Sequence, residues 1–129
     1  MITEVIPGKL YRSARPGYDG GRPTPVGSGQ IQMWLEAAQS AGVASIICLL
    51  SDEHLRLYPD GSLVDIYRTA GFEVRHVPVT DHKRPPLSAE ELAHVLAAYR
   101  ELPKPVLVHC SAGIDRTGAA IRRLTSSEP

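Results

Sequence analysis

An apolar run at the centre of the chain constrains the fold more than any other feature. Residues 43–50 read Val-Ala-Ser-Ile-Ile-Cys-Leu-Leu and contain no charged side chain. A strand buried on both faces has this composition, whereas a strand with one face in water alternates apolar and polar residues. Burial on both faces requires helices on each side of the sheet. The run therefore predicts a central strand of an α/β domain.

The segments around this run alternate between strand and helix patterns. Further strands are predicted at residues 2–6, 9–13, 72–79 and 105–109, and helices at 30–40, 62–70, 88–102 and 116–124. Ser88-Ala-Glu-Glu91 is a capping box that opens the third helix. Glycine and proline make residues 16–29 and 81–86 loops. We therefore expect a single domain over residues 1–129, of class α/β, with a central and mostly parallel sheet of four to five strands flanked by helices.

Charge and cysteine content exclude several classes of protein. Lysine plus arginine equals aspartate plus glutamate, at 14 each, so we expect no nucleic-acid partner and no anionic membrane surface as a partner. The two cysteines, Cys48 and Cys110, form neither a disulfide framework nor a metal-binding pair. No apolar run approaches the ~18 residues of a membrane span, and the N-terminus lacks a signal-peptide pattern. We expect a cytoplasmic protein without cofactor or metal.

The segment His109-Cys-Ser-Ala-Gly-Ile-Asp-Arg-Thr-Gly118 carries the chemistry. It follows a predicted strand and opens a predicted helix, so unpaired backbone N–H groups and the helix dipole favour an anion there. Gly113 allows the backbone angles of a tight loop, and Arg116 adds a bidentate grip on phosphate oxygens. The same field favours the thiolate of Cys110, which is the nucleophilic form of cysteine.

This segment resembles the His-Cys-x-x-Gly-x-x-Arg-Ser/Thr loop of protein tyrosine and dual-specificity phosphatases, especially compact bacterial and archaeal members. The resemblance implies a metal-independent reaction in which Cys110 attacks phosphorus and water hydrolyses the cysteinyl-phosphate. Thr117 would assist departure of the thiolate, and His109 would orient the loop. The backbone of the loop would bind phosphate, together with Arg116; the remaining loop residues are Ser111, Ala112, Gly113, Ile114 and Asp115.

Two further segments extend the resemblance. Residues 9–16, Lys-Leu-Tyr-Arg-Ser-Ala-Arg-Pro, are similar to the segment with which compact members of the superfamily begin, and residues 77–81, Val-Pro-Val-Thr-Asp, to their general-acid loop. Asp81 is therefore the first candidate for the acid that protonates the leaving group. Asp115, inside the phosphate loop, and Asp52, after the central strand, are the alternatives.

Several other residues have both a structural and a functional interpretation. Cys48 is either a core side chain or a partner that traps oxidised Cys110 as a disulfide. Residues 82–84, His-Lys-Arg, either bind further phosphates or form a solvated loop. The loop 16–29, with Tyr18, is either a recognition loop or a connector. Arg12 and Arg15 are interpreted as structural support.

The resemblance implies a phosphorylated protein or a small phosphomonoester as substrate. Phosphotyrosine comes first, with phosphoserine and phosphothreonine as further substrates. A phosphoinositide or inositol-phosphate phosphatase is the first alternative, although the variable loop positions carry no basic residue. A phospho-binding module without catalysis is the second. Because few residues follow the loop, we expect one face of the sheet to be thinly covered, in a monomer or a weak dimer.

Overall fold

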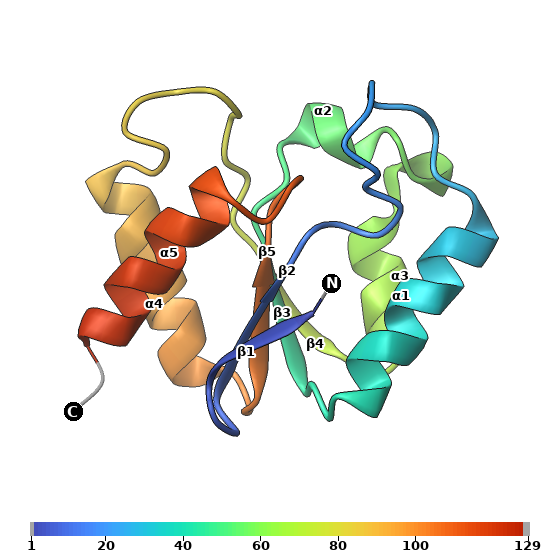
Figure 1. Cartoon of the computed structure of the whole chain (residues 1–129). Coiled ribbons are helices and arrows are strands. Elements are labelled where there is room, and N and C mark those ends of the chain that lie inside the picture. The colour runs from blue at the N-terminus through green and yellow to red at the C-terminus, as the bar shows by residue number, and fades with distance from the viewer. Residues whose placement is uncertain (1, 128–129) are drawn as a thin grey trace.

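The computed structural model describes residues 2–127 and forms one five-stranded sheet in the order β1-β2-β5-β3-β4 (Figure 1). The strands are β1 (Thr3–Ile6), β2 (Leu10–Ser13), β3 (Ser45–Cys48), β4 (Glu73–His76) and β5 (Val106–His109). Strands β2, β5, β3 and β4 are parallel, and β1 is an antiparallel edge strand. The predicted α/β class with a mostly parallel sheet is confirmed.

Helices cover both faces of the sheet, as Figure 1 shows. Helices α1 (Ser28–Ser40) and α3 (Leu63–Thr69) pack on one face, and α4 (Ala89–Glu101) and α5 (Asp115–Ser126) on the other. The expectation of a thinly covered face is therefore wrong, because a long amphipathic α4 closes the α5 side. Within residues 2–127, no helix is long and apolar enough to cross a bilayer.

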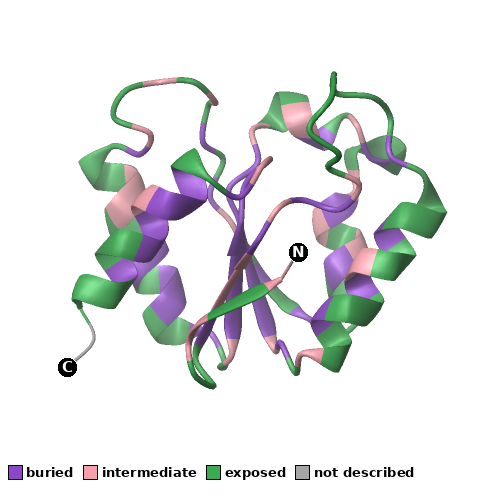
Figure 2. Ribbon diagram, in the orientation of Figure 1, coloured by how far each residue is buried: buried purple, intermediate pink, exposed green. Residues whose placement is uncertain are grey.

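The two strands at the middle of the sheet are the most buried part of the molecule (Figure 2). Every residue of β3 is buried, as the apolar run 43–50 predicted, and so is every residue of β5. Successive side chains of a strand point to opposite faces. Ile46 and Cys48 therefore enter the core under α1 and α3, and Ile47 enters the core under α4 and α5.

Several boundaries differ from the sequence prediction. A short helix α2 (Asp52–Leu55) and a 3-10 turn η1 (Pro59–Gly61) lie where no element was predicted. Helix α1 begins at Ser28, inside the predicted loop, because the Gln30 side chain accepts a hydrogen bond from the Gly27 N–H at 3.1 Å. Strand β4 stops at His76 because Pro78 has no N–H, although Val79 still donates to the carbonyl of Leu49.

Candidate active site

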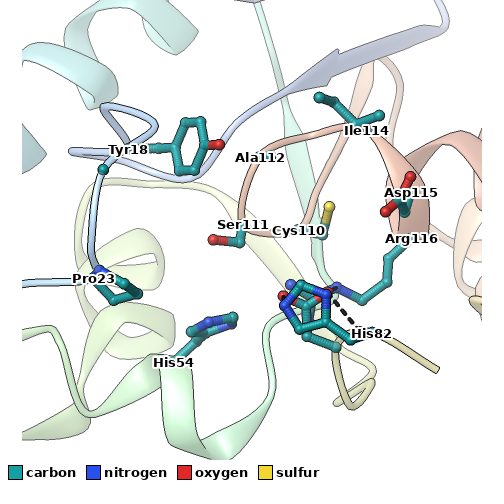
Figure 3. Close-up of a pocket in the computed structure, with 12 residues that line it drawn as sticks. Tyr18, Pro23, His54, His82, Cys110, Ser111, Ala112, Ile114, Asp115 and Arg116 are labelled. Atoms are coloured by element: carbon teal, nitrogen blue, oxygen red, sulfur yellow. Dashed lines mark hydrogen bonds and ion pairs between the residues drawn. The ribbon is translucent and has the colours of Figure 1, made fainter.

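Three loops meet at the carboxyl edge of the parallel strands, where ligands bind in open α/β sheets. They follow β3, β4 and β5, and together with the loop after β2 they enclose a pocket of about 480 Å³ (Figure 3). The residues that line it are Tyr18, Gly21, Pro23, His54, Asp81, His82, Cys110, Ser111, Ala112, Ile114, Asp115 and Arg116. The pocket thus joins the predicted phosphate loop to Asp81.

The phosphate loop is held in a shape that requires glycine at position 113. Gly113 has a φ of +77°, in the left-handed region, and a Cβ there would lie 2.5 Å from the carbonyl oxygen of Ser13. The Gly113 carbonyl in turn accepts a hydrogen bond of 2.7 Å from Nη2 of Arg12. Strand β2 therefore supports the phosphate loop from behind.

Cys110 opens this loop directly after β5. Its side chain is almost wholly buried, yet it contributes to the pocket lining. Its carbonyl accepts a hydrogen bond of 2.9 Å from Nδ1 of His109. Because a carbonyl only accepts, the proton of His109 sits on Nδ1, and the Tyr67 hydroxyl donates to Nε2 at 2.9 Å. His109 therefore fixes the orientation of the Cys110 peptide.

Burial keeps His109 neutral in this arrangement. The side chain is fully buried, and burial lowers the pKa of His109 to about 4, with a further lowering from the positive charge of Arg116. The Trp34 ring stacks on Tyr67 at 5.2 Å and meets the edge of His109 at 5.6 Å. The aromatic packing and the single tautomer hold the start of the phosphate loop in one position.

Arg116 brings a buried guanidinium to the same pocket. Its Nη1 donates to the carbonyl of Val79 at 2.8 Å, with a longer contact of 3.4 Å to the carbonyl of Leu49. Its Nε and Nη2 are buried and have no hydrogen-bond partner in the described part of the chain. Buried donors without partners are costly, and a bound oxyanion would satisfy them.

Asp81 lies beside this guanidinium. Its Oδ1 is 3.4 Å from Nε of Arg116 and also accepts the backbone N–H of His82 at 2.9 Å. Its Oδ2 is 3.4 Å from Nε2 of His82. Asp115 also lines the pocket but is exposed at the start of α5, and Asp52, on α2, does not line it. Of the three candidate acids, Asp81 has the most contacts with the site.

Some of the remaining residues of the phosphate loop are buried or hydrogen-bonded within the protein, and others lie at the rim of the pocket. The Thr117 hydroxyl is buried without a hydrogen-bond partner among residues 2–127. The Ser111 hydroxyl accepts a hydrogen bond of 3.0 Å from Nε of Arg15. Ala112 is half-buried, and Ile114 is exposed at the rim of the pocket. The structure thus brings together every predicted site residue except the alternative Asp52.

Residues 20–125 match the family described as "Tc-R-P: Polymorphic toxin system, DSP-PTPase phosphatase". That match covers most of the chain and includes the whole phosphate loop. The chain belongs to the Tc-R-P family of phosphatases. It is therefore a phosphatase of the dual-specificity and tyrosine phosphatase type, which acts on phosphorylated substrates. The predicted family is confirmed, and no curated protein is similar enough in sequence to be matched.

Solved structures of other phosphatases share the fold. A DUF442 protein from Shewanella putrefaciens superposes with a TM-score of 0.68 at 23% identity, over 99% of this chain and 74% of its own. A mutant of Tk-PTP gives 0.65 at 25% identity, over 97% and 71%. Kinase associated phosphatase, with its catalytic-site cysteine changed to serine, gives 0.66 at 18% identity, over 93% and 68%.

The Tc-R-P phosphatase also contains a support network that the sequence indicated only in part. Arg15 is 5% exposed; its N–H donates to the Ser111 carbonyl at 2.9 Å, and its Nη1 donates to the Tyr58 hydroxyl at 3.3 Å. Tyr58 in turn donates to the carbonyl of Pro16 at 2.6 Å. Structural support was predicted for Arg12 and Arg15, and both contact the phosphate loop. Tyr67 lies in the predicted helix 62–70, whereas Tyr58 lies outside every predicted element and carried no sequence signal.

The two cysteines of the phosphatase lie in different core clusters. Cys48 packs under α1 and α3, whereas Cys110 belongs to the cluster under α4 and α5. Burial raises the pKa of Cys48 to about 12, so its thiol stays protonated and unreactive. Cys48 thus packs in the core, and the charge interaction between Cys48 and Cys110 shows that the two thiols are near neighbours.

The basic loop 82–84 is less positive than its sequence suggests. Lys83 pairs with Glu91 of α4 at 2.6 Å, and His82 pairs with Asp81. Arg84 is exposed and lies with them beside a smaller cavity of about 170 Å³ next to the active site. Of the three side chains, two are thus engaged within the protein.

Proposed function

We propose that this phosphatase hydrolyses phosphotyrosine, with phosphoserine and phosphothreonine as further substrates, through a metal-independent cysteinyl-phosphate mechanism. One observation carries the proposal: the thiol of Cys110 and the buried guanidinium of Arg116 line the same pocket as Asp81. Nη2 of Arg116 makes no hydrogen bond within residues 2–127, and its Nε lies 3.4 Å from the Asp81 carboxylate. This arrangement supplies a nucleophile, an oxyanion site and an acid within one cavity. The charge of the phosphate is met by a guanidinium and by backbone N–H groups.

In the first step, the Cys110 thiolate attacks phosphorus. An S–P bond forms while the P–O bond to the leaving group breaks, and Asp81 donates its proton to the departing oxygen. Arg116 and the loop N–H groups stabilise the charge on the three equatorial oxygens. Because β2 and His109 hold the loop before substrate arrives, little reorganisation is needed.

In the second step, water hydrolyses the cysteinyl-phosphate. Asp81, now a carboxylate, accepts a proton as the water oxygen attacks phosphorus, and the S–P bond breaks. The buried Thr117 hydroxyl, which lacks another partner among the described residues, is the group that donates a hydrogen bond to the departing thiolate. Inorganic phosphate and a free Cys110 thiolate complete the cycle.

A phosphoinositide or inositol-phosphate substrate is supported less well by this geometry. Such substrates carry several phosphates and need uncompensated positive charge around the pocket. Lys83 is neutralised by Glu91, and two of the pocket-lining charges are the carboxylates of Asp81 and Asp115. We therefore favour a substrate with a single phosphate.

The decisive experiment is hydrolysis of p-nitrophenyl phosphate and of a phosphotyrosine peptide, in EDTA with reductant, by the wild type and by Cys110→Ser. We expect turnover of both substrates by the wild type and a loss of at least about a thousandfold in the variant, because a serine hydroxyl is a far weaker nucleophile. Full activity of Cys110→Ser, or a requirement for added metal ions, would contradict the mechanism.

A further inference from the structure

The exposed large apolar side chains of the described residues gather around the active site. Within residues 2–127 there are three of them, Tyr18 at 39% exposure, Met33 at 72% and Ile114 at 65%. Tyr18 and Ile114 line the active-site pocket, and Met33 lines a neighbouring cavity of about 430 Å³, here called the flanking cavity. Exposed apolar side chains that cluster in this way mark a surface that binds a further molecule.

Tyr18 connects the flanking cavity to the active-site pocket, because its side chain lines both. Its ring lies over the guanidinium of Arg15, with 5.7 Å between the ring centroid and Cζ. Nε of the same guanidinium donates to the Ser111 hydroxyl of the phosphate loop at 3.0 Å. Figure 3 shows the Tyr18 ring at the edge of the active-site pocket. The flanking cavity therefore begins at a side chain that is itself placed by the phosphate loop.

The aromatic wall of the flanking cavity is held in position by the fold. Trp34, which also lines the cavity, donates from Nε1 to the carbonyl of Ala14 at 3.0 Å, and its ring stacks on Tyr67 at 5.2 Å. The backbone N–H of Tyr18 donates to the Arg15 carbonyl at 3.2 Å. A surface that is ordered in advance binds a side chain with a smaller loss of conformational entropy.

The charges of the flanking cavity disfavour an acidic side chain. Asp19 brings a carboxylate to the lining. Arg15 also lines the cavity, but it is 5% exposed and its guanidinium is already bonded to Ser111 and to the Tyr58 hydroxyl. The other side chains of the lining are uncharged, so a large apolar side chain fits this cavity best.

We propose that the flanking cavity binds a large apolar side chain of a phosphopeptide, one or two residues away from the phosphorylated residue. An extended peptide advances about 3.3 Å per residue, so this spacing carries the chain past the Tyr18 ring. The substrate class is a phosphorylated protein segment with a leucine or a similar side chain beside the phosphorylated residue. The inference rests on the proposed phosphatase function and names a preference of that site.

The experiment measures kcat/KM for pairs of phosphotyrosine peptides that carry leucine or alanine at one position, from two residues before the phosphotyrosine to two residues after it. In the wild type, we expect leucine to raise kcat/KM about five- to tenfold at one of these positions, because part of its side chain is buried in the open cavity. The ratio compares two peptides with the same enzyme, so a general loss of activity in a variant cancels.

Variants at Met33 test whether the flanking cavity is the source of this ratio. Met33→Glu should lower the leucine-to-alanine ratio to between one and about two, and should favour lysine over alanine at the same position by a few-fold. Met33→Leu, which keeps an apolar side chain, should keep the ratio. Gln32→Glu is the matched control, because it adds the same charge at an exposed position of α1 that does not line the cavity, and it should leave the ratio unchanged.

The outcomes separate this inference from the proposed function. Turnover of p-nitrophenyl phosphate and of every peptide, without a preference for leucine at any position, would overturn the role of the flanking cavity and leave the phosphatase mechanism intact. A preference that persists in Met33→Glu would also overturn it. So would a wild-type dimer that Met33→Glu dissociates without changing the peptide ratios, because the occupant would then be a second copy of the chain. Absence of turnover with all substrates would overturn the proposed function and this inference together.

Discussion

The phosphate loop and the acid loop line the same pocket, but they are held in different ways. In the phosphate loop, the carbonyls of Cys110, Ser111 and Gly113 each accept a hydrogen bond from a residue outside the loop or at its edge. In the acid loop, residues 77–81, the Val79 carbonyl and the Asp81 carboxylate both contact Arg116, and Asp81 also accepts the N–H of His82. Just after it, the Lys83–Glu91 pair ties the chain to α4.

This difference follows from what each loop does in the proposed reaction. The oxyanion site must be in place before the reaction, since reorganisation during the chemical step would raise the barrier. The acid meets leaving groups of different shapes and must later serve as a base. We therefore expect rigidity to be concentrated where charge develops.

After Cys110→Ser, the largest effect is expected for Asp81→Asn. Removing a general acid costs roughly a hundredfold or more in kcat, because the leaving oxygen departs without a proton. The loss should be greater with phenyl phosphate than with p-nitrophenyl phosphate, whose leaving group is more stable as an anion. Steady-state kinetics with both substrates measures this, and a larger loss in Asp115→Asn than in Asp81→Asn would assign the acid to Asp115.

Gly113→Ala should disrupt the phosphate loop. The substitution combines left-handed strain with a Cβ placed 2.5 Å from the Ser13 carbonyl oxygen, and we expect a loss of about 2–3 kcal/mol in unfolding free energy. Gly20→Ala is the matched control, because Gly20 has a φ of +85° but nothing within 4 Å of an added Cβ. Urea denaturation compares the two variants. Equal losses of unfolding free energy would show that the phosphate loop shifts to relieve the contact between the added Cβ and Ser13.

Stability should fall with acid because His109 is buried as a neutral ring. Unfolded histidine binds a proton near pH 6.5, whereas the folded protein resists protonation until about pH 4. The unfolded state binds more protons in this window, so the stabilisation is complete above about pH 6.5 and is lost as the pH falls. We expect wild type to lose about 2 kcal/mol more than His109→Asn between pH 7 and pH 5. Parallel urea titrations test this, and identical pH slopes would contradict it.

Lys83→Met should have the smallest effect. The Lys83 and Glu91 side chains are 33% and 21% exposed, and solvent screens such pairs, so the loss in stability should stay under about 1 kcal/mol. Raising the salt concentration should reduce the loss further. Thermal unfolding at low and high salt checks this, and a loss of several kcal/mol would mean that the acid loop is held as firmly as the phosphate loop.

The fold could be predicted from the sequence because its signals are local. The apolar run 43–50 and the capping box at Ser88 identified a buried strand and a helix, and both elements are present. The short helix α2 was missed because its stability comes from the buried Leu55 and the Ser51 cap rather than from an extended periodic pattern. His54, which lies on this helix, was also missed, because a lone histidine belongs to no motif whose spacing could identify it.

The sequence by itself determined the nucleophile, the guanidinium and their loop, because Cys110, Gly113 and Arg116 lie within one short segment whose spacing dictates their geometry. Only the tertiary structure decided which groups approach that loop from elsewhere. The contacts of Asp81 with Arg116, of Arg12 with Gly113, and the position of His54 depend on how the separate strands align in the sheet. Strand register is a long-range property, and it paired Cys48 with His109 and placed Cys48 in a different core cluster from Cys110.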